Sequence, residues 1–324
     1  MRIVVTGSAG HLGEALVREL RDAHDVVGLD LLASPFTRVV ASITDRATVR
    51  DVLGGCEVVL HAATLHKPHV GSHAKHEFVD TNITGTLVLL EEAAREGVGS
   101  FVFTSTTSAF GRALSAPPGA PAAWIDERVV AQPKNIYGAT KCAAEDLCEL
   151  AHREHGLPVI VLRTSRFFPE PDDRDDVRAE YADANVKANE LLYRRVDVED
   201  IVTAHVRAIE RARQIGFAKY VVTATTPFAR DDAAELGADA PAVVRRLVPG
   251  YEAVYRARGW RMFPRIDRVY DNARARRELG WTPRYDFARA IDALAAGEDP
   301  RSPLARAIGA KGYHATTTGV YTRR

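Results

Sequence analysis

The chain has 324 residues, of which 43 are basic and 43 acidic, so its formal net charge is zero. This balance excludes the strong global field that recruits nucleic acids or anionic membranes. Hydrophobic residues make up 46% and charged residues 27%, which predicts a globular protein of one large or two small domains. Three cysteines lie in no metal-binding spacing, and we find neither a signal peptide nor a membrane span. We therefore expect reduced thiols and a cytoplasmic location.

The N-terminal stretch follows the pattern of a buried strand, a glycine-rich turn and a helix. The β-branched run 3–5 precedes Gly7, Gly10 and Gly13, and an amphipathic helical pattern follows. Glycines at this spacing remove the Cβ atoms that would keep a pyrophosphate from the helix N-terminus, where free N–H groups favour an anion. The strand, the helix and a later acid argue against a glycine turn without a ligand.

The second apolar run ends in Asp30, seventeen residues after Gly13. A carboxylate there suits both hydroxyls of an adenine ribose and repels the 2′-phosphate of NADP, so we predict NAD as the cofactor. The residues of this first unit assigned to cofactor binding are Gly7, Ala9, Gly10, His11, Leu12, Gly13 and Asp30.

Strand and helix patterns alternate to about residue 165, which predicts a doubly wound parallel sheet of the Rossmann type. The later strands are expected at 37–41, 57–61, 101–105 and 159–163, and the helices at 46–53, 78–96 and 137–155. Small residues at a strand's carboxyl end let a dinucleotide pass over the sheet. The further cofactor-binding candidates are Ser42, Ile43, His61, Ala62, Ala63 and Asn82.

Beyond residue 165 the pattern becomes irregular and predicts a small C-terminal α/β substrate lobe. The proline- and charge-rich segment 168–178 is expected to be a loop. A helix at 200–213 and a strand at 219–223 follow, with further helices at 232–247, 273–279 and 287–296. We predict an NAD-binding domain at 1–165, a mainly substrate lobe at 166–300 with 195–223 returning to the sheet, and a tail at 301–324. The basic residues of the tail favour a surface strap or solvated tail over a nucleic-acid arm.

Tyr137 and Lys141 are four residues apart on a predicted helix and so share one face. A lysine charge about 4 Å from a phenol, at an effective dielectric near 20, would lower the phenol pKa by roughly two to three units. Tyr137 would then exchange a proton with a substrate hydroxyl. Thr106 follows the predicted strand 101–105 and can hydrogen-bond the reacting oxygen. An exposed helix face and ordinary turn hydroxyls remain the alternative.

These motifs resemble the extended short-chain dehydrogenases/reductases of the NAD-dependent epimerase/dehydratase family. The resemblance covers residues 1 to about 290 and rests on TGSAGHLG (6–13), HAA (61–63), NITGT (82–86), FTSTTSAFG (103–111), YGATK (137–141), LRTSRFFP (162–169), RVDVEDI (195–201) and RELGWTP (277–283). It implies that Thr106, Tyr137 and Lys141 are catalytic, that Lys141 also binds the nicotinamide ribose, and that Ser105 lines the cofactor side.

The resemblance also implies a homodimer formed by the helices 78–96 and 137–155. Its apolar face would draw on Leu87, Val88, Leu90, Cys148 and Leu150. The alternative is that these side chains only face the subunit's own sheet.

The substrate half departs from the nucleotide-sugar enzymes of this family. Only 26 residues separate Pro169 from Val196, and Arg166 stands where those enzymes usually have asparagine. A similar shortening occurs in uronate dehydrogenases, and Thr107-Ser108 replaces the acid–base pair of a dehydratase. We rank a nucleotide-sugar epimerase first, an NAD-dependent dehydrogenase of a free sugar or sugar acid second, and a non-catalytic NAD-binding regulator third.

Five histidines lie within sixteen residues: His61, His66, His69, His73 and His76. Imidazoles at these spacings suit a metal, but no cysteine joins them, and the segment follows a strand over the expected active site. We therefore predict a substrate-lining loop and no metal. The candidates for substrate binding are His66, Lys67, Thr106, Thr107, Arg166 and Arg195.

Overall fold

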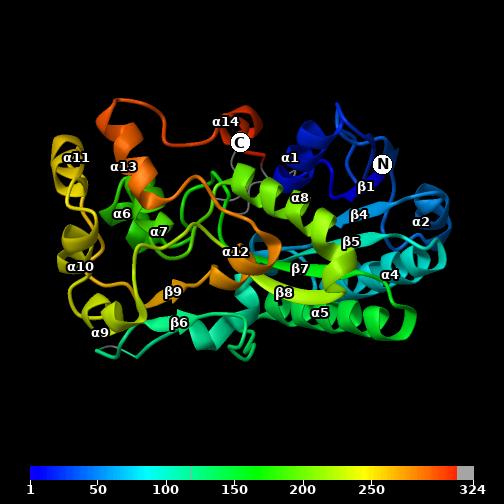
Figure 1. The fold of residues 1–324 in the computed structure, drawn as a ribbon, viewed down its shortest axis with the longest axis horizontal. Coiled ribbons are helices and arrows are strands. Elements are labelled where there is room, and N and C mark those ends of the chain that lie inside the picture. The colour runs from blue at the N-terminus through cyan, green and yellow to red at the C-terminus, as the bar shows by residue number, and fades with distance from the viewer. Residues whose placement is uncertain (118, 312–324) are drawn as a thin grey trace.

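The computed structural model describes residues 1–117 and 119–311, and its centre is a seven-stranded, all-parallel sheet (Figure 1). The strands run in the order β3-β2-β1-β4-β5-β7-β8. They are β1 (Arg2–Thr6), β2 (Asp25–Asp30), β3 (Val39–Val40), β4 (Val58–His61), β5 (Ser100–Thr106), β7 (Val159–Thr164) and β8 (Phe217–Val222). The strand order reverses between β1 and β4, which confirms the predicted doubly wound fold.

Alternate residues of each strand face two different helical layers. Ile3 and Val5 pack with one layer and Val4 with the other, because successive side chains of a strand point to opposite faces. The first layer holds α1 (His11–Leu20), α8 (Val198–Ile215) and α12 (Ala273–Leu279), and the second holds α2 (Arg46–Leu53), α4 (Gly85–Arg95) and α5 (Ile136–His155) (Figure 1). Burial on both faces explains the continuous apolar runs of the strands.

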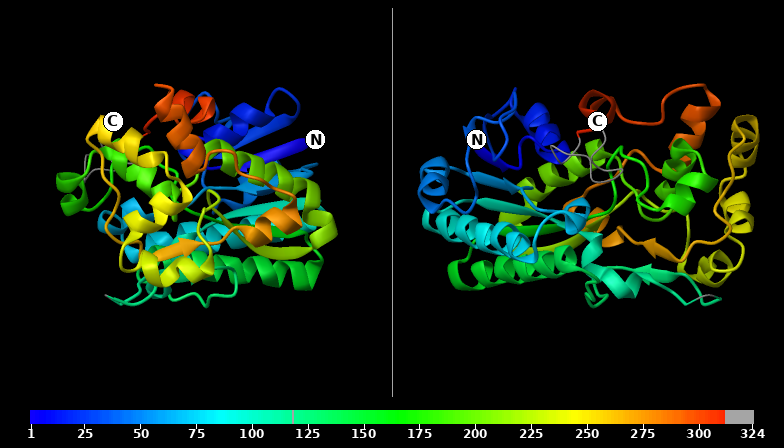
Figure 2. Two further views of the ribbon diagram at one scale, coloured as in Figure 1. Left: turned by 60° about the vertical axis from the view of Figure 1, so that its left-hand side comes forward. Right: turned by 180° about the vertical axis from the view of Figure 1, so that it is seen from behind.

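The C-terminal lobe has a hydrophobic core of its own beside the carboxyl ends of the strands (Figure 2). Its elements are the two-stranded parallel sheet of β6 (Ala123–Ile125) and β9 (Arg268–Tyr270), and the helices α6 (Asp175–Glu180), α7 (Asp183–Leu191), α9 (Ala233–Leu236), α10 (Ala240–Leu247), α11 (Tyr251–Arg258), α13 (Phe287–Ala295) and α14 (Pro303–Ile308). β6 lies within the predicted NAD-binding range 1–165 but pairs with β9 of the lobe.

Several predicted elements differ in detail from the structure. The expected helix 78–96 is split into α3 (Lys75–Val79), a π-helical turn (Asp80–Thr84) and α4. The segment 168–178 is a loop only as far as residue 174, where α6 follows. The expected helix 232–247 is broken between α9 and α10, because Pro241 lies in the first turn of α10 and needs a new helix start. The predicted tail contains α14, while its residues 312–324 lie outside the described residues.

The predicted dimer face is largely internal. Val88, Leu90 and Cys148 are buried in the core between the sheet and its helices, so they cannot supply an intersubunit surface. Leu87 and Leu150 are half-buried and remain available. The homodimer therefore stays a prediction, with a smaller apolar face than expected. Among the described residues, no helix is long and apolar enough to cross a membrane.

Candidate active site

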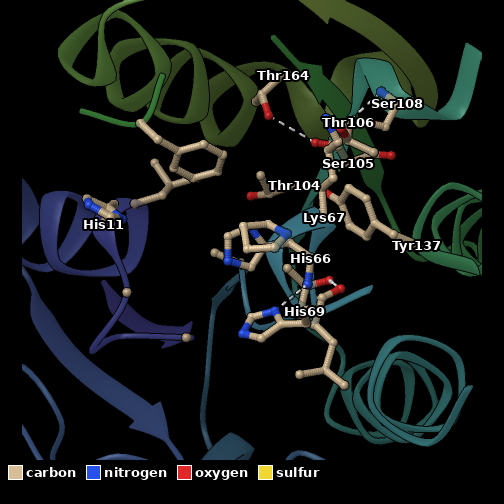
Figure 3. A pocket seen from close by; sticks show the side chains of 18 of the residues that line it. His11, His66, Lys67, His69, Thr104, Ser105, Thr106, Ser108, Tyr137 and Thr164 are labelled. Atoms are coloured by element: carbon tan, nitrogen blue, oxygen red, sulfur yellow. Dashed lines mark hydrogen bonds between the residues drawn. The ribbon is translucent and has the colours of Figure 1, made fainter. Parts of the chain in front are cut away.

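A cavity of about 650 Å³ lies at the carboxyl ends of the parallel strands, where the strand order reverses. Open parallel sheets bind ligands at this point. The predicted site residues that line the cavity are Gly7, Ala9, Gly10, His11, Leu12, Gly13, Asp30, Ser42, Ile43, Ala62, Ala63, His66, Lys67, Ser105, Thr106, Thr107, Tyr137 and Arg166. In Figure 3, Tyr137 and Thr106 come together on one side of the cavity and His11 lies on the other.

Two glycines of the turn leave no room for a Cβ atom, because the start of α1 packs closely against the end of β1. A Cβ on Gly13 would lie 1.9 Å from the Gly7 carbonyl oxygen, and a Cβ on Gly7 would lie 2.7 Å from the Ala63 nitrogen. Gly7 also has a φ of 75°, which favours glycine. Within the described residues no side chain caps the N-terminus of α1 at Gly10, and residues 10–13 line the cavity.

Asp30 ends β2 beside this turn, as the prediction of a ribose-binding acid requires. Its Oδ2 accepts a hydrogen bond from the Ala9 N–H at 3.0 Å, and its Oδ1 accepts one from the Leu32 N–H at 2.9 Å. These bonds hold the carboxylate at the cavity edge. The glycine turn and this acid together could hold the pyrophosphate and the adenine ribose of NAD.

Tyr137 and Thr106 are brought together by the start of α5 and the end of β5. The Asn135 side chain accepts a hydrogen bond from the Gly138 N–H at 3.0 Å, so α5 begins at this point and Tyr137 lies in its first turn. Thr106 Oγ1 accepts the Ser108 N–H at 3.0 Å and also hydrogen-bonds Tyr137. A substrate hydroxyl placed against both groups would have a proton acceptor and a hydrogen-bond partner.

Lys141 lies beneath the cavity rather than on its surface. It is 2% exposed, and its Nζ donates to the Thr104 carbonyl oxygen at 2.6 Å. Burial lowers the pKa of Lys141 to about 7 and raises the pKa of Tyr137 to about 12, against the smaller effect of the Thr106 hydrogen bond. The predicted lowering of the Tyr137 pKa is therefore wrong for this structure, because burial raises this pKa by more than the Thr106 hydrogen bond lowers it.

Three residues that were predicted to contact a ligand do not line the cavity but bond to segments that form its walls. His61 is buried between Thr6 and Thr86, with its ring nitrogens 2.8 and 2.9 Å from their hydroxyls, and burial lowers its pKa. The Asn82 side chain bonds both backbone groups of Leu65. Arg195 pairs with buried Glu190 and donates to the Phe168 carbonyl oxygen. Their direct contact with a ligand stays a prediction.

The histidine segment forms part of the cavity wall. His66 lies 5.3 Å from the Phe168 ring, and the His66 N–H donates to His69 Nδ1 at 2.9 Å at the start of a 3₁₀ turn (Lys67–Gly71). Among residues 1–117 and 119–311, no three His, Cys, Asp or Glu side chains are grouped as metal ligands. His66 and Lys67 line the cavity, and their contact with a substrate stays a prediction.

The lobe side of the cavity carries three guanidinium groups, from Arg166, Arg194 and Arg268. Asp172 and Glu190 lie buried against them, with Arg166–Asp172 and Arg194–Glu190 distances of 2.5 and 2.6 Å. Although burial raises the Glu190 pKa, the neighbouring arginines lower it to about 2, so this carboxylate is ionised. Arg268 pairs with exposed Asp267 at 2.9 Å.

Sequence reasoning did not assign several residues of this wall. Arg194, Arg268, Asp173, Tyr270 and Lys311 line the cavity but were not among the predicted site residues. The closely spaced arginines near residue 194 were a usable signal. β9 and Lys311 offered none, because their place depends on contacts between segments far apart in the chain.

The model of the NAD dependent epimerase/dehydratase family matches residues 3–222 of the chain. The chain belongs to this family. Its motifs had predicted this membership, and family members are NAD-dependent enzymes. Membership of this NAD-dependent family confirms the cofactor prediction.

Two curated relatives show how the similarity is distributed. A dTDP-glucose 4,6-dehydratase of Streptomyces niveus is 37% identical over 193 residues, which cover 52% of this chain and 55% of that protein. A uronate dehydrogenase of Pseudomonas putida is 26% identical over 183 residues, covering 53% and 63%. The matched part of the chain thus spans between about half and two thirds of the length of these relatives.

Two solved structures share the fold over most of the chain. A UDP-N-acetylglucosamine 4-epimerase from Bacillus cereus has a TM-score of 0.63 at 18% identity, covering 91% of this chain and 98% of that one. A short-chain dehydrogenase/reductase superfamily protein from Agrobacterium tumefaciens with bound NAD has a TM-score of 0.65 at 22% identity, covering 91% and 96%. At these identities the likeness establishes the fold.

We predict that Gly13→Ala destabilises the protein and abolishes measurable NAD binding. The new Cβ would lie 1.9 Å from the Gly7 carbonyl oxygen, so backbone must move, at a cost of about 1–3 kcal/mol. Thermal unfolding and NAD titration check this. Gly250→Ala is the matched control, because Gly250 has a φ of −66° and open space around its Cβ position. Equal effects of the two substitutions would contradict the assignment.

We predict a pH-dependent stability difference between the NAD-free protein and its Lys141→Met variant. Folding lowers the Lys141 pKa from 10.5 to about 7, so between these pH values the unfolded chain holds more protons. The free energy of unfolding of the parent should therefore rise with pH relative to the variant, by about 3 kcal/mol between pH 6.5 and 9.5. Denaturant unfolding at three pH values measures it, and a constant difference would refute the burial of this charge.

Proposed function

We propose that the protein is an NAD-dependent dehydrogenase that oxidises a hydroxyl group of a free sugar acid. The observation that carries this proposal is the guanidinium wall of Arg166, Arg194 and Arg268 on the lobe side of the cavity. A guanidinium group binds a carboxylate through two parallel N–H···O bonds. Such a wall suits a small substrate that carries its own negative charge.

The charges behind the wall support an anionic ligand. Arg166, Arg194 and Arg195 surround two buried carboxylates, those of Asp172 and Glu190. Arg268 adds a further guanidinium group to the wall and pairs with exposed Asp267. The carboxylates hold the guanidinium groups in place, because both are fully or almost fully buried. Guanidinium groups held in this way at the cavity wall suit a ligand that carries a carboxylate.

An ion pair connects two segments that line the proposed substrate space. Lys67, which follows β4, forms an ion pair with Asp173, which follows β7, and both residues line the cavity. Against the effect of burial, the Lys67 ammonium lowers the Asp173 pKa. Together with the short segment between Pro169 and Val196, this ion pair leaves little chain to grip a nucleotide. A free sugar needs no such grip.

The proposed chemistry uses Tyr137 and Thr106 at the substrate hydroxyl. Thr106 hydrogen-bonds the hydroxyl oxygen, and Tyr137 accepts its proton as the C–O bond becomes a carbonyl. When bound, NAD accepts the hydride from the same carbon. Burial raises the pKa of Tyr137, and the Thr106 hydrogen bond lowers it in part, toward the ionised phenol that a proton acceptor must be. Lys141 places its amino group beneath this pair, where its Nζ donates to the Thr104 carbonyl oxygen.

Net oxidation is favoured over epimerisation by the way the substrate is anchored. An epimerase must turn its keto sugar over without losing it, which requires an anchor outside the sugar ring. A sugar acid held by its own carboxylate must release that anchor before it can turn, so the oxidised product leaves instead. The proposed product is therefore a keto sugar or a lactone.

A nucleotide-sugar epimerase is the second candidate, and it is favoured by the same arginines. Two adjacent guanidinium groups, those of Arg194 and Arg268, would also suit the two phosphates of a nucleoside diphosphate. The B. cereus protein named as a UDP-N-acetylglucosamine 4-epimerase shares the fold over 91% of this chain. The two candidates differ in the fate of the hydride: a dehydrogenase releases it in the reduced cofactor, and an epimerase returns it to the sugar.

A substrate panel separates the two candidates. Free uronic acids, neutral aldoses and UDP-, GDP- and dTDP-sugars are each incubated with NAD while absorbance at the NADH band and product stereochemistry are followed. We predict stoichiometric NADH with a uronic acid, and a rate at least about 100-fold lower in Tyr137→Phe. Inverted nucleotide sugar without NADH would overturn the proposal in favour of the epimerase.

The role of the guanidinium wall is tested in the same assay. Arg194→Gln should raise KM for the acidic sugar at least about tenfold and leave KM for a neutral aldose unchanged, since only the acid uses the charge. Arg128→Gln is the matched control, because Arg128 is an exposed arginine paired with Asp126 outside the cavity. Equal changes of KM for acidic and neutral sugars would show that Arg194 does not bind the substrate carboxylate.

A further inference from the structure

A C-terminal strap, defined here as residues 299–311, returns from the lobe to the NAD-binding half of the molecule. The Ser302 N–H and hydroxyl bond the Asp197 carboxylate at 3.0 and 2.6 Å. Leu304, Ala305 and Ile308 then pack on the core that α1 and α8 share, and Figures 1 and 2 show α14 beside α1. The strap is therefore fixed against the helix whose first turn belongs to the dinucleotide site.

Lys311 of the strap reaches that first turn. Its Nζ forms an ion pair with Glu14 of α1, and its N–H donates to Glu170 Oε1 at 3.3 Å. His11 Nε2 lies 3.2 Å from the same Glu170 oxygen. Lys311 also lines the cavity together with Gly10, His11 and Gly13. Three segments far apart in the chain thus meet at the N-terminus of α1.

Glu14 poses an electrostatic problem at this position. Its carboxylate lies in the first turn of α1 and is almost fully buried, beside the N–H groups on which the dinucleotide pyrophosphate would rest. A buried negative charge there repels a second one, because screening by water is weak. Arg18 pairs with Glu14 from the side of the next turn, at 2.7 Å. Lys311 is the cation that pairs with it from the cavity side.

We infer that Lys311 is part of the dinucleotide site, where it neutralises Glu14 and so opens the N-terminus of α1 to the pyrophosphate. The strap makes cofactor affinity depend on a residue almost 300 positions from the glycine turn. Because Glu170 accepts from Lys311 and contacts His11, the strap also links the segment after β7 to the cofactor side. This inference concerns NAD binding and does not depend on which sugar is oxidised.

A double-mutant cycle on NAD binding tests the inference. Dissociation constants for NAD and ADP are measured without substrate, by calorimetry, for the parent, Lys311→Met, Glu14→Gln and the double variant. We expect Lys311→Met to weaken binding of both ligands at least about tenfold, which is about 1.4 kcal/mol. Glu14→Gln alone should not weaken binding, and the double variant should bind close to the parent.

Two further variants separate charge from structure. Lys311→Arg keeps the charge and should bind NAD within about threefold of the parent, and Arg306→Met, on the exposed side of the strap, should not change binding. Unfolding curves of all variants confirm that each is folded. NAD binding by Lys311→Met equal to that of the parent, or a double variant no better than Lys311→Met, would overturn the inference. Failure of the sugar panel would leave these binding results unaffected.

Discussion

The close approach of the first turn of α1 to the end of β1 is the constraint on which the rest of the site depends. Only a residue without a Cβ fits at Gly13, because a Cβ there would lie 1.9 Å from the Gly7 carbonyl oxygen. Because the helix begins so near the strand, its N–H groups lie where the strand order reverses. The same cavity is lined by Asp30 and Ala63, which lie at or just after the ends of their strands, and by Tyr137, which lies at the start of α5.

Paired charges determine what this volume can accept. Burying an ion costs free energy unless a partner offsets the lost hydration, and the carboxylates around the cavity have such partners. Glu14 is matched by Arg18 and Lys311 at the cofactor side. Glu190 and Asp172 are outnumbered by arginines at the lobe side. Under the proposed function, the pyrophosphate lies beside the paired Glu14 and the substrate lies beside the guanidinium groups.

The Rossmann half was predictable because its signals are local. Strands buried on both faces are continuous apolar runs, and the glycine spacing and the Tyr137–Lys141 spacing each lie within a few residues of chain. The pKa of Tyr137 was not predictable in the same way, since burial is a property of the whole fold. β6 and β9 are only three residues long and pair across about 145 positions, and Lys311 reaches α1 from nearly 300 positions away.

The most direct measurement of whether this site oxidises a sugar and releases it follows a deuterium atom on the carbon that bears the reacting hydroxyl. The labelled sugar acid is given a single turnover with NAD and the parent protein, and cofactor and sugar are separated and analysed by mass. We predict that the deuterium is recovered in reduced cofactor, in an amount equal to the oxidised sugar. Deuterium returned to an inverted carbon of the sugar, with no reduced cofactor released, would contradict the proposed dehydrogenase.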